Sequence, residues 1–343
     1  MKVTPSTRFL NRLHRLPISV EGVLQEVTGE GNLNFLNEKI YLCGDLCYMI
    51  EKSKILPWLA AVATVAIWAE TFISSKVVIG RGVHPADLFF YRFVIAYIFI
   101  WIISPKKLLS ENWKDELLFV ALGVTGGSLY FLAENTALEY STASNVAILV
   151  SSAPLMTALV VGAFHKEERL SPGQLAGSLI AFVGMALVVL NGSLVLHISP
   201  VGDSMAIGAA LMWAFYSLIL RKVSGRYDTV FITRKVFAYG LVTMLFYFLI
   251  VRPLNFDRTV LSEPAVWGNI VYLGTVASLL CFLMWNWAIG KIGTVKTTNL
   301  IYGQSFFTMF IASVVLGEKI TPMAILGAMI LVIGMMLAFK RRA

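Results

Sequence analysis

The sequence predicts an all-α polytopic membrane protein with ten transmembrane helices, arranged as two inverted repeats of five helices each. Hydrophobic residues make up 57% of the 343 residues and charged residues only 14%, and the mean hydropathy is +0.75. Soluble globular domains carry about 25% charged residues, so this composition indicates a chain that lies mostly in a bilayer. Two repeats are predicted because one motif occurs twice.

The duplicated motif is a polar turn followed by an apolar run. Glu-Arg-Leu-Ser-Pro at 168–172 opens the first copy, and Glu-Lys-Ile-Thr-Pro at 318–322 opens the second. In each copy a hydroxyl residue can cap the helix, and proline takes the first helical position, where its missing N–H costs nothing. Each run carries two glycines seven residues apart on one helix face, which lets a neighbouring helix approach closely and predicts a packing role. These glycines are Gly177, Gly184, Gly327 and Gly334.

Other counterparts extend the duplication to the rest of the chain. Asn-Thr-Ala-Leu at 135–138 corresponds to Asn-Trp-Ala-Ile at 286–289, and Trp68 corresponds to Trp213. Each stage of the first half therefore has a partner in the second.

Residues 1–54 are polar and mixed, and they contain no apolar run long enough for a signal-peptide core. We interpret them as a polar extension, either disordered or a mis-assigned start, followed by the repeats at 55–191 and 201–340. Loose helical spacing of leucine and valine between 10 and 24 is compatible with an amphipathic surface helix. Met49 directly precedes a short polar lead into the first apolar run, so a natural start at Met49 is a hypothesis.

Ten apolar runs meet the length of about 20 residues that a spanning helix needs. The first five are predicted at 56–79, 86–104, 117–138, 143–164 and 172–191. The second five are predicted at 201–222, 230–251, 267–289, 294–316 and 322–339.

The lysines and arginines of the connections predict the orientation, because such residues concentrate on the cytoplasmic side. With a cytoplasmic N-terminus, the outer connections hold only Arg81, Arg252, Arg258 and Lys319, and the inner ones hold far more. We therefore expect a multi-pass protein of the cell membrane (plasma or inner membrane) with both termini cytoplasmic. Five spans is an odd number, so the second repeat must enter from the opposite side. Inverted repeats place a binding site at their interface and work by alternating access.

With these motifs the chain resembles the drug/metabolite transporter superfamily, specifically its ten-helix EamA type, over about residues 56–339. The Gly-Glu-Lys-Ile-Thr-Pro stretch at 317–322 is similar to the family's last-helix pattern, and Trp68 stands where members often carry Trp-Gly. The resemblance implies gradient-driven transport of amino acids and other small metabolites through a cavity lined by spans 1, 3, 4, 6, 8 and 9. One departure is Gly303-Gln304-Ser305, where span 9 lacks the proline that span 4 has at Pro154.

Ionisable groups inside spans are few, and such groups normally face a cavity or a partner. Glu70 lies about halfway along span 1, with Ser74 one turn later. Its carboxylate can bind a substrate amine or take up a coupling proton. The alternative is a Glu70–Lys76 pair that only fixes helix packing.

Other polar residues complete the candidate site. Glu134 lies in the outer half of span 3, where it can alternatively snorkel to the interface. The asparagines can alternatively form interhelical hydrogen bonds, and Tyr216 can alternatively serve packing. The polar first half of span 9 should line a cavity, because lipid would not tolerate it. The predicted substrate-binding set is Glu70, Glu134, Asn135, Asn145, Tyr216, Asn286, Asn299, Tyr302 and Gln304, with Glu70 also the candidate for proton coupling.

Three cations are not assigned to this set. Arg92, Arg234 and Lys235 lie near predicted span ends, so we expect interface charges there, with anion binding as the alternative.

We therefore expect a secondary active transporter, an exporter of small metabolites such as amino acids or related amphiphilic compounds, with proton coupling as a hypothesis. An organic-anion or sugar-phosphate carrier would need two or more deep cations, and a passive channel or membrane scaffold is the other alternative. The expected partners are a small-molecule substrate and the bilayer, and the oligomeric state stays open, with a monomer among the options.

Other function classes are disfavoured. The four histidines fall in the N-terminal stretch or in connections, so no catalytic, metal or cofactor site is predicted. The lysines and arginines form no basic stripe for nucleic acid. The three cysteines, Cys43, Cys47 and Cys281, fit neither a disulfide framework nor a zinc site.

Overall fold

The computed structural model describes residues 55–105, 109–110, 112–164, 171–190, 199–307, 310 and 321–339. The polar extension, its amphipathic helix and the start at Met49 lie outside the described residues, as do residues 168–170 and 317–320 of the duplicated motif. The helices described below all belong to one unit that runs from Pro57 to Ala343, except that the first helix begins at Leu56.

Helices account for nearly all of the described residues. The first repeat contains α4 (Leu56–Gly80), α5 (Pro85–Ile103), α6 (Trp113–Gly123), η1 (Val124–Ser128), α7 (Leu129–Tyr140), α8 (Ala143–Val150), α9 (Ala153–Phe164) and α10 (Pro172–Leu190). The second contains α11 (Pro200–Val223), α12 (Thr229–Ile250), α13 (Arg258–Leu261), α14 (Pro264–Tyr272), η3 (Leu273–Leu280), α15 (Cys281–Ile292), α16 (Thr294–Asn299), η4 (Leu300–Gly303) and α18 (Pro322–Phe339).

Spans 1 to 8 of the prediction are confirmed as helices long and apolar enough to cross a membrane. Span 3 is the continuous run α6–η1–α7, and span 8 is α14–η3–α15. Span 9 is described over 294–307 and at 310, and span 10 is the shorter apolar helix α18. The observed helix ends lie within about four residues of the predicted ones where both are described.

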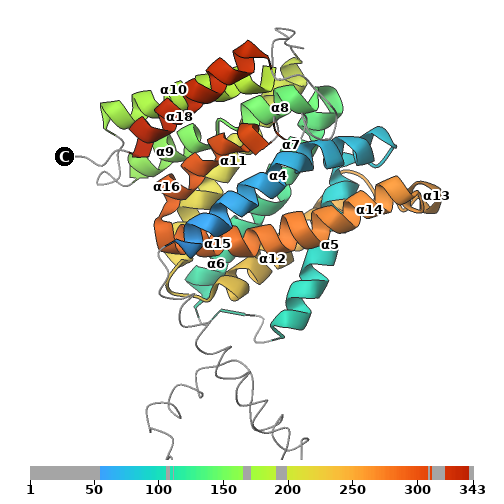
Figure 1. The fold of residues 1–343 in the computed structure, drawn as a ribbon. Helices are drawn as coiled ribbons and strands as arrows, with labels where there is room; N and C mark the ends of the chain where they lie inside the picture. Colours follow the sequence, from blue (N-terminus) through green and yellow to red (C-terminus); the bar gives the residue numbers. More distant parts are fainter. Residues whose placement is uncertain are drawn as a thin grey trace, which may run out of the picture. The chain divides into compact units, whose positions relative to one another are not determined.

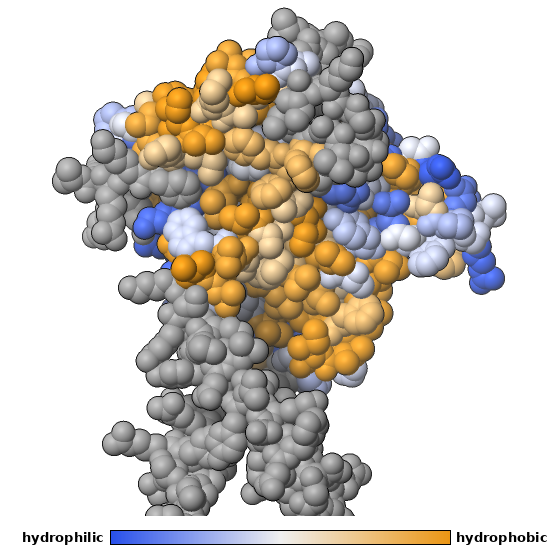
Figure 2. Space-filling view, in the orientation of Figure 1, coloured by the Kyte–Doolittle hydropathy of each residue, from blue (hydrophilic) through white to orange (hydrophobic). Residues whose placement is uncertain are grey.

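The surface supports a membrane location. Apolar side chains cover most of the described helices on the face in Figure 2, and polar residues gather around α13. Leu249 and Ile250 at the end of α12 are 82% and 80% exposed. Such a surface would be unfavourable in water, but it matches the acyl chains of a bilayer.

The twin motifs cap their helices as predicted. The Ser171 hydroxyl accepts a hydrogen bond from the Gln174 N–H (3.3 Å), and the Gln174 side chain accepts one in return from the Ser171 N–H (3.0 Å). The Thr321 hydroxyl accepts from the Ala324 N–H (3.2 Å). Each cap satisfies a backbone donor that the first helical turn leaves open.

The glycine faces of the twin helices pack on each other. Helices α10 and α18 lie side by side in Figure 1 and form an extensive contact. A Cβ at Gly184 would overlap the backbone of Leu331, and one at Gly334 would overlap the backbone of Ala181. The predicted close approach is therefore confirmed, and the partner of each helix is its own counterpart in the other repeat.

Four spans depart from α-helical geometry, in two pairs at matching places. The π-helical segments η1 and η3 interrupt spans 3 and 8. Span 4 breaks at Ser151 and Ser152, just before Pro154, and span 9 tightens into the 3₁₀ turn η4 at the equivalent place. Span 9 therefore leaves the α-helical path without the proline, through a short 3₁₀ turn of the kind that often marks a functional hinge.

Gly184→Ala should destabilise the protein by about 1–3 kcal/mol, because the added methyl group must push two helix backbones apart. Gly173→Ala is the matched control, since a Cβ at Gly173 meets nothing within 4 Å. Thermal unfolding of the purified protein in detergent should give a lower midpoint for the first variant only. Equal midpoints would mean that the two helices do not pack through these glycines.

Candidate functional site

A cavity of about 40 Å³ lies in the centre of the described helices. Because one water molecule needs roughly 10–15 Å³ of such space, the cavity holds only a few waters. Its lining residues are Trp68, Thr71, Phe72, Arg92, Tyr130, Phe131, Glu134, Val150, Ala153, Trp213, Phe282, Ile301 and Gln304. They come from spans 1, 2, 3, 4, 6, 8 and 9, so both repeats contribute.

Eight of the thirteen lining residues form pairs of equivalent positions in the two repeats. Trp68 and Trp213 are 145 positions apart, as in the duplication read from the sequence, and their rings lie in edge-to-face contact with centroids 5.3 Å apart. Three further pairs are 151 positions apart, the offset that relates Asn135 to Asn286. They are Phe131 and Phe282, Val150 and Ile301, and Ala153 and Gln304. The cavity therefore lies where the two repeats meet.

Two opposite charges break this symmetry. Arg92 on α5 and Glu134 on α7 are 2% and 3% exposed, and both line the cavity. Their charges interact, but no ion pair within 4.0 Å joins them in the described structure. The N-cap residues of α5 and α12, His84 and Asp228, are 144 positions apart, so Val236 corresponds to Arg92, and Trp285 corresponds to Glu134 at the offset of 151. Only the first repeat therefore supplies charges here.

The expectation that Arg92 is an interface charge near a span end is wrong. Arg92 is the eighth residue of α5, about 10 Å along the helix, and its side chain points inward instead of snorkelling. Its Nε donates a hydrogen bond to the Ser278 hydroxyl (2.9 Å), and its guanidinium carbon lies 4.3 Å from the centre of the Phe131 ring. The sequence did hold a signal for this inward position, because Arg92 is a single arginine inside an apolar run.

Two members of the predicted site, Glu134 and Gln304, line the cavity. The Tyr130 hydroxyl, one turn before Glu134 on the same helix, interacts with the Glu134 carboxylate. The Gln304 amide donates a hydrogen bond to the Trp68 carbonyl (3.0 Å). The buried position of Glu134 excludes the snorkelling alternative, and the lining role of Gln304 agrees with the expectation that the first half of span 9 faces a cavity.

The π-helical segment η3 fixes one wall of the cavity. In an α-helix the Ala277 carbonyl would accept from the Cys281 N–H, but that N–H bonds to the Ser278 and Val276 carbonyls. The Ala277 carbonyl accepts the indole N–H of Trp68 (3.0 Å). The irregular turn thereby holds a tryptophan of the other repeat, which fits the frequent occurrence of such turns at functional sites.

Glu70 is placed differently from Glu134. It is absent from the cavity lining, and its carboxylate accepts a hydrogen bond from the Ser74 hydroxyl (2.6 Å), with the Tyr272 phenol beside it. The alternative pair with Lys76 is not formed between these described residues. Lys76 Nζ donates instead to the backbone carbonyls of Leu138 and Ser141.

The asparagines Asn135 and Asn286 join helices outside the cavity lining. The Asn135 amide donates to the Pro85 carbonyl (3.1 Å), which ties span 3 to span 2. The Asn286 amide donates to the Thr233 hydroxyl (2.9 Å), which ties span 8 to span 7, and its oxygen accepts from the Tyr216 hydroxyl (2.5 Å). Each repeat therefore uses one asparagine in the same way.

The remaining candidates also lie outside the cavity lining. The Asn145 amide donates to Ser141 (3.0 Å) and to the Asp203 carboxylate (2.6 Å) at the predicted outer end. Tyr302 is buried in an apolar cluster with Ile148 and Leu331. Asn299 is buried too, and its side-chain oxygen makes no hydrogen bond within the described residues.

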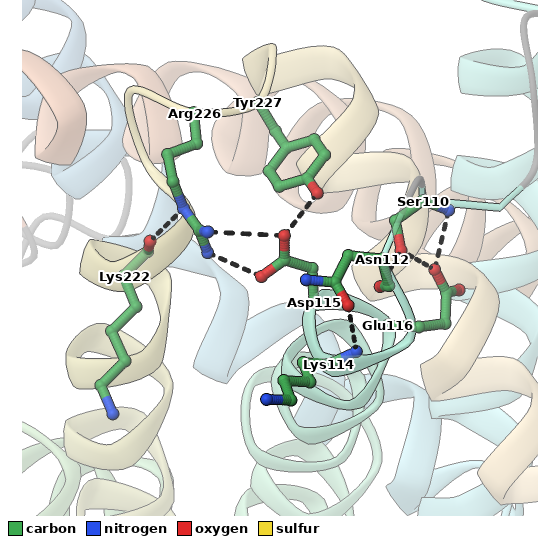
Figure 3. Close-up of polar contacts among 8 residues, drawn as sticks. All are labelled: Ser110, Asn112, Lys114, Asp115, Glu116, Lys222, Arg226 and Tyr227. Carbon is green, nitrogen blue, oxygen red and sulfur yellow. Dashed lines mark hydrogen bonds and ion pairs between the residues drawn. The ribbon is translucent and has the colours of Figure 1, made fainter.

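A polar network closes the predicted cytoplasmic end (Figure 3). Asp115 at the start of α6 forms an ion pair with Arg226 (2.8 Å) and accepts from the Tyr227 hydroxyl (2.6 Å). Glu116 forms an ion pair with Lys235. Lys235 is one of the residues expected to be interface charges near span ends. Both acids belong to the first repeat and both cations to the second. At the other end, Asp87 and Arg252 join the repeats in the same manner (2.8 Å).

The model of the EamA-like transporter family matches two stretches of the chain, residues 56–190 and 200–340. The chain belongs to the EamA-like transporter family. It is therefore a multi-pass membrane transporter with the two-repeat helical fold of that family.

Three relatives show how far the similarity extends. An uncharacterized transporter of Archaeoglobus fulgidus is 27% identical, over 81% of this chain and 96% of the relative. A probable terminal-alkyne amino-acid exporter of Streptantibioticus cattleyicolor is 26% identical, over 82% and 93%. A probable amino-acid metabolite efflux pump of Escherichia coli is 24% identical, over 80% and 92%. One protein of known crystal structure has the same fold, with a TM-score of 0.64 at 19% identity over 84% of this chain and 98% of its own.

Asn286→Leu should destabilise this EamA-like chain by about 2–3 kcal/mol, because it leaves the buried Tyr216 hydroxyl and the Thr233 hydroxyl without their shared partner. Tyr216→Phe, which removes only one of these bonds, should cost about 1 kcal/mol. Denaturant unfolding in detergent measures both losses. Unchanged stability combined with weaker substrate binding would instead place Asn286 in the substrate site.

Proposed function

We propose that this chain is a secondary active transporter that exports small amphiphilic metabolites, such as amino acids or related compounds, across the cell membrane. Both termini would lie in the cytoplasm, as the distribution of lysine and arginine predicts. Substrate would bind in the central cavity, and the two repeats would expose it alternately to the two sides.

The composition of the central cavity carries this proposal. A buried carboxylate, Glu134, faces aromatic walls built around Trp68 and Trp213. A carboxylate attracts an ammonium group, and aromatic faces accept both cations and apolar side chains. A small molecule with an amine and an apolar part fits this combination. The names of two relatives, a probable terminal-alkyne amino-acid exporter and a probable amino-acid metabolite efflux pump, agree with it.

The contacts at the two ends support alternating access. Ion pairs between the repeats lie at the predicted cytoplasmic end, where Asp115 meets Arg226, and at the other end, where Asp87 meets Arg252. Alternating access requires a cavity that lies between two such sets of contacts. Opening one end would break one set of contacts and keep the other.

The rival carriers have less support. An organic-anion or sugar-phosphate carrier needs several deep cations, and Arg92 is the one cation among the described residues that line the cavity. Of the two other candidates, Lys296 is exposed and Lys76 bonds to carbonyls near the end of span 3. A passive channel would be expected to hold a continuous aqueous path, which a cavity for a few waters does not offer.

Counterflow separates a carrier from a channel. Proteoliposomes loaded with unlabelled leucine or phenylalanine should accumulate the labelled amino acid transiently above equilibrium, because a carrier exchanges one bound molecule for another. Phosphorylated sugars should not replace the amino acids in this assay. Equilibration without an overshoot for every amino acid tested would contradict the proposal.

We assign proton coupling, if transport is coupled to protons, to Glu134 in preference to Glu70. Glu134 shares the cavity with the substrate, so a proton and a substrate ammonium would compete for the same carboxylate. The charged and titratable groups beside it are Arg92 on α5 and Tyr130 on its own helix. Glu70 stays the second candidate, because it is the carboxylate halfway along span 1.

Glu134→Gln should make the transport rate independent of pH and lower the affinity for a substrate amine about tenfold or more, since a charged hydrogen bond contributes about 1.5–3 kcal/mol. Glu70→Gln is the matched control and should keep the pH profile of the native protein. Rates in proteoliposomes over a range of pH measure both effects. A flat profile in Glu70→Gln alone would move the coupling site to Glu70.

A further inference from the structure

We propose that Arg92 binds the carboxylate of a zwitterionic substrate whose ammonium group faces Glu134. This inference rests on the proposed function, because it assigns a role to a second charge in the same cavity. It makes Arg92 a specificity-determining residue and adopts for it the anion-binding alternative that the sequence left open.

The hydrogen bonding of Arg92 leaves its two terminal amino groups available. Within the described structure the guanidinium makes one hydrogen bond, from Nε to the Ser278 hydroxyl. The two terminal nitrogens of arginine form a planar fork that matches the two oxygens of a carboxylate. A buried guanidinium that uses only Nε therefore presents the part of its surface that recognises carboxylates.

The surroundings hold the guanidinium in one orientation. Ser278 is fully buried in η3 and anchors Nε from the second repeat. The Phe131 ring, also on the cavity wall, supports the guanidinium at 4.3 Å. A fixed arginine loses less conformational entropy when a ligand binds, so these two contacts favour recognition of a carboxylate.

Arg92 and Glu134 face the same cavity as separate charges. Two buried opposite charges are costly unless each is compensated at close range, and these two form no direct ion pair with each other. A ligand with a carboxylate and an ammonium group compensates both at once. A ligand with only one of these groups leaves the other protein charge without compensation.

The cavity therefore selects by charge type. A simple amine would meet Glu134 but leave Arg92 uncompensated, and a simple carboxylate would do the reverse. The apolar part of the ligand would contact Trp68, Trp213 and Phe282, which line the same space. Alpha-amino acids with apolar side chains carry all three features.

Two sets of matched ligands test this inference on the purified full-length chain. One set is phenylalanine, 2-phenylethylamine, which lacks the carboxylate, and 3-phenylpropionate, which lacks the ammonium group. The other set is leucine, 3-methylbutylamine and 4-methylpentanoate. Calorimetric titration in detergent should give about tenfold or more tighter binding of the zwitterion than of the amine, as expected for one charged contact.

Arg92→Gln should remove this preference, so that the zwitterion and the amine bind equally, with the zwitterion weakened about tenfold or more. Arg92→Lys keeps the charge but lacks the fork, and it should restore part of the preference. Arg234→Gln is the matched control, because Arg234 is equally buried but bonds to the Ser104 carbonyl away from the cavity lining. It should keep the full preference. If Arg92→Gln does not fold, Arg92→Lys carries the same comparison.

The outcomes separate this inference from the proposed function. If the native protein binds the amine as tightly as the zwitterion, or if both Arg92 variants keep the full preference, Arg92 does not bind the carboxylate, although the transport of amines remains supported. If the native protein binds no member of either set and shows no counterflow with amino acids, the proposed function fails and the role of Arg92 fails with it.

Discussion

The absence of water in the hydrocarbon core is the constraint on which this structure depends. Polar groups there must find partners within the protein, or they cost several kcal/mol each. Some buried polar side chains meet this requirement through contacts between helices, as when Asn286 joins Tyr216 to Thr233, and others bond to carbonyls of their own helix. The separated charges of Arg92 and Glu134 are an exception at the cavity, and that exception is what marks the site.

The duplication accounts for the helical framework that the two repeats share. Sequence divergence between them accounts for the charges that only the first repeat places at the cavity. The two repeats supply equivalent aromatic walls, equivalent π-helical segments and equivalent asparagine contacts. When two similar halves exchange their conformations, the state open to one side and the state open to the other have similar free energies. This suits a protein that must open to both sides. Arg92 corresponds to Val236 in the second repeat and Glu134 corresponds to Trp285, so both charges of the cavity belong to the first repeat.

The sequence predicts helices better than it predicts which helix face turns inward. Helix positions followed from the lengths of apolar runs, and the packing of Gly184 and Gly334 followed from their spacing, because both depend on local chemistry. The inward position of Arg92 was missed because α5 is apolar on every side, so lipid-facing and bundle-facing positions have the same composition. The offsets between the repeats are a better guide to inward-facing positions. The offset of 145 relates Trp68 to Trp213 and the offset of 151 relates Phe131 to Phe282, and all four residues line the cavity.

The tryptophans around the cavity also give the protein an optical signature. Trp68 has ring centroids 5.3 Å from Trp213 and 5.0 Å from Trp285, and the latter two are 6.1 Å apart. Indole rings this close couple their electronic transitions, and the coupling produces circular dichroism in the near ultraviolet that depends on distance and angle. Because Trp68 belongs to one repeat and the other two to the second, separation of the repeats changes this coupling. The native chain can therefore report the opening of its own cavity without an added label.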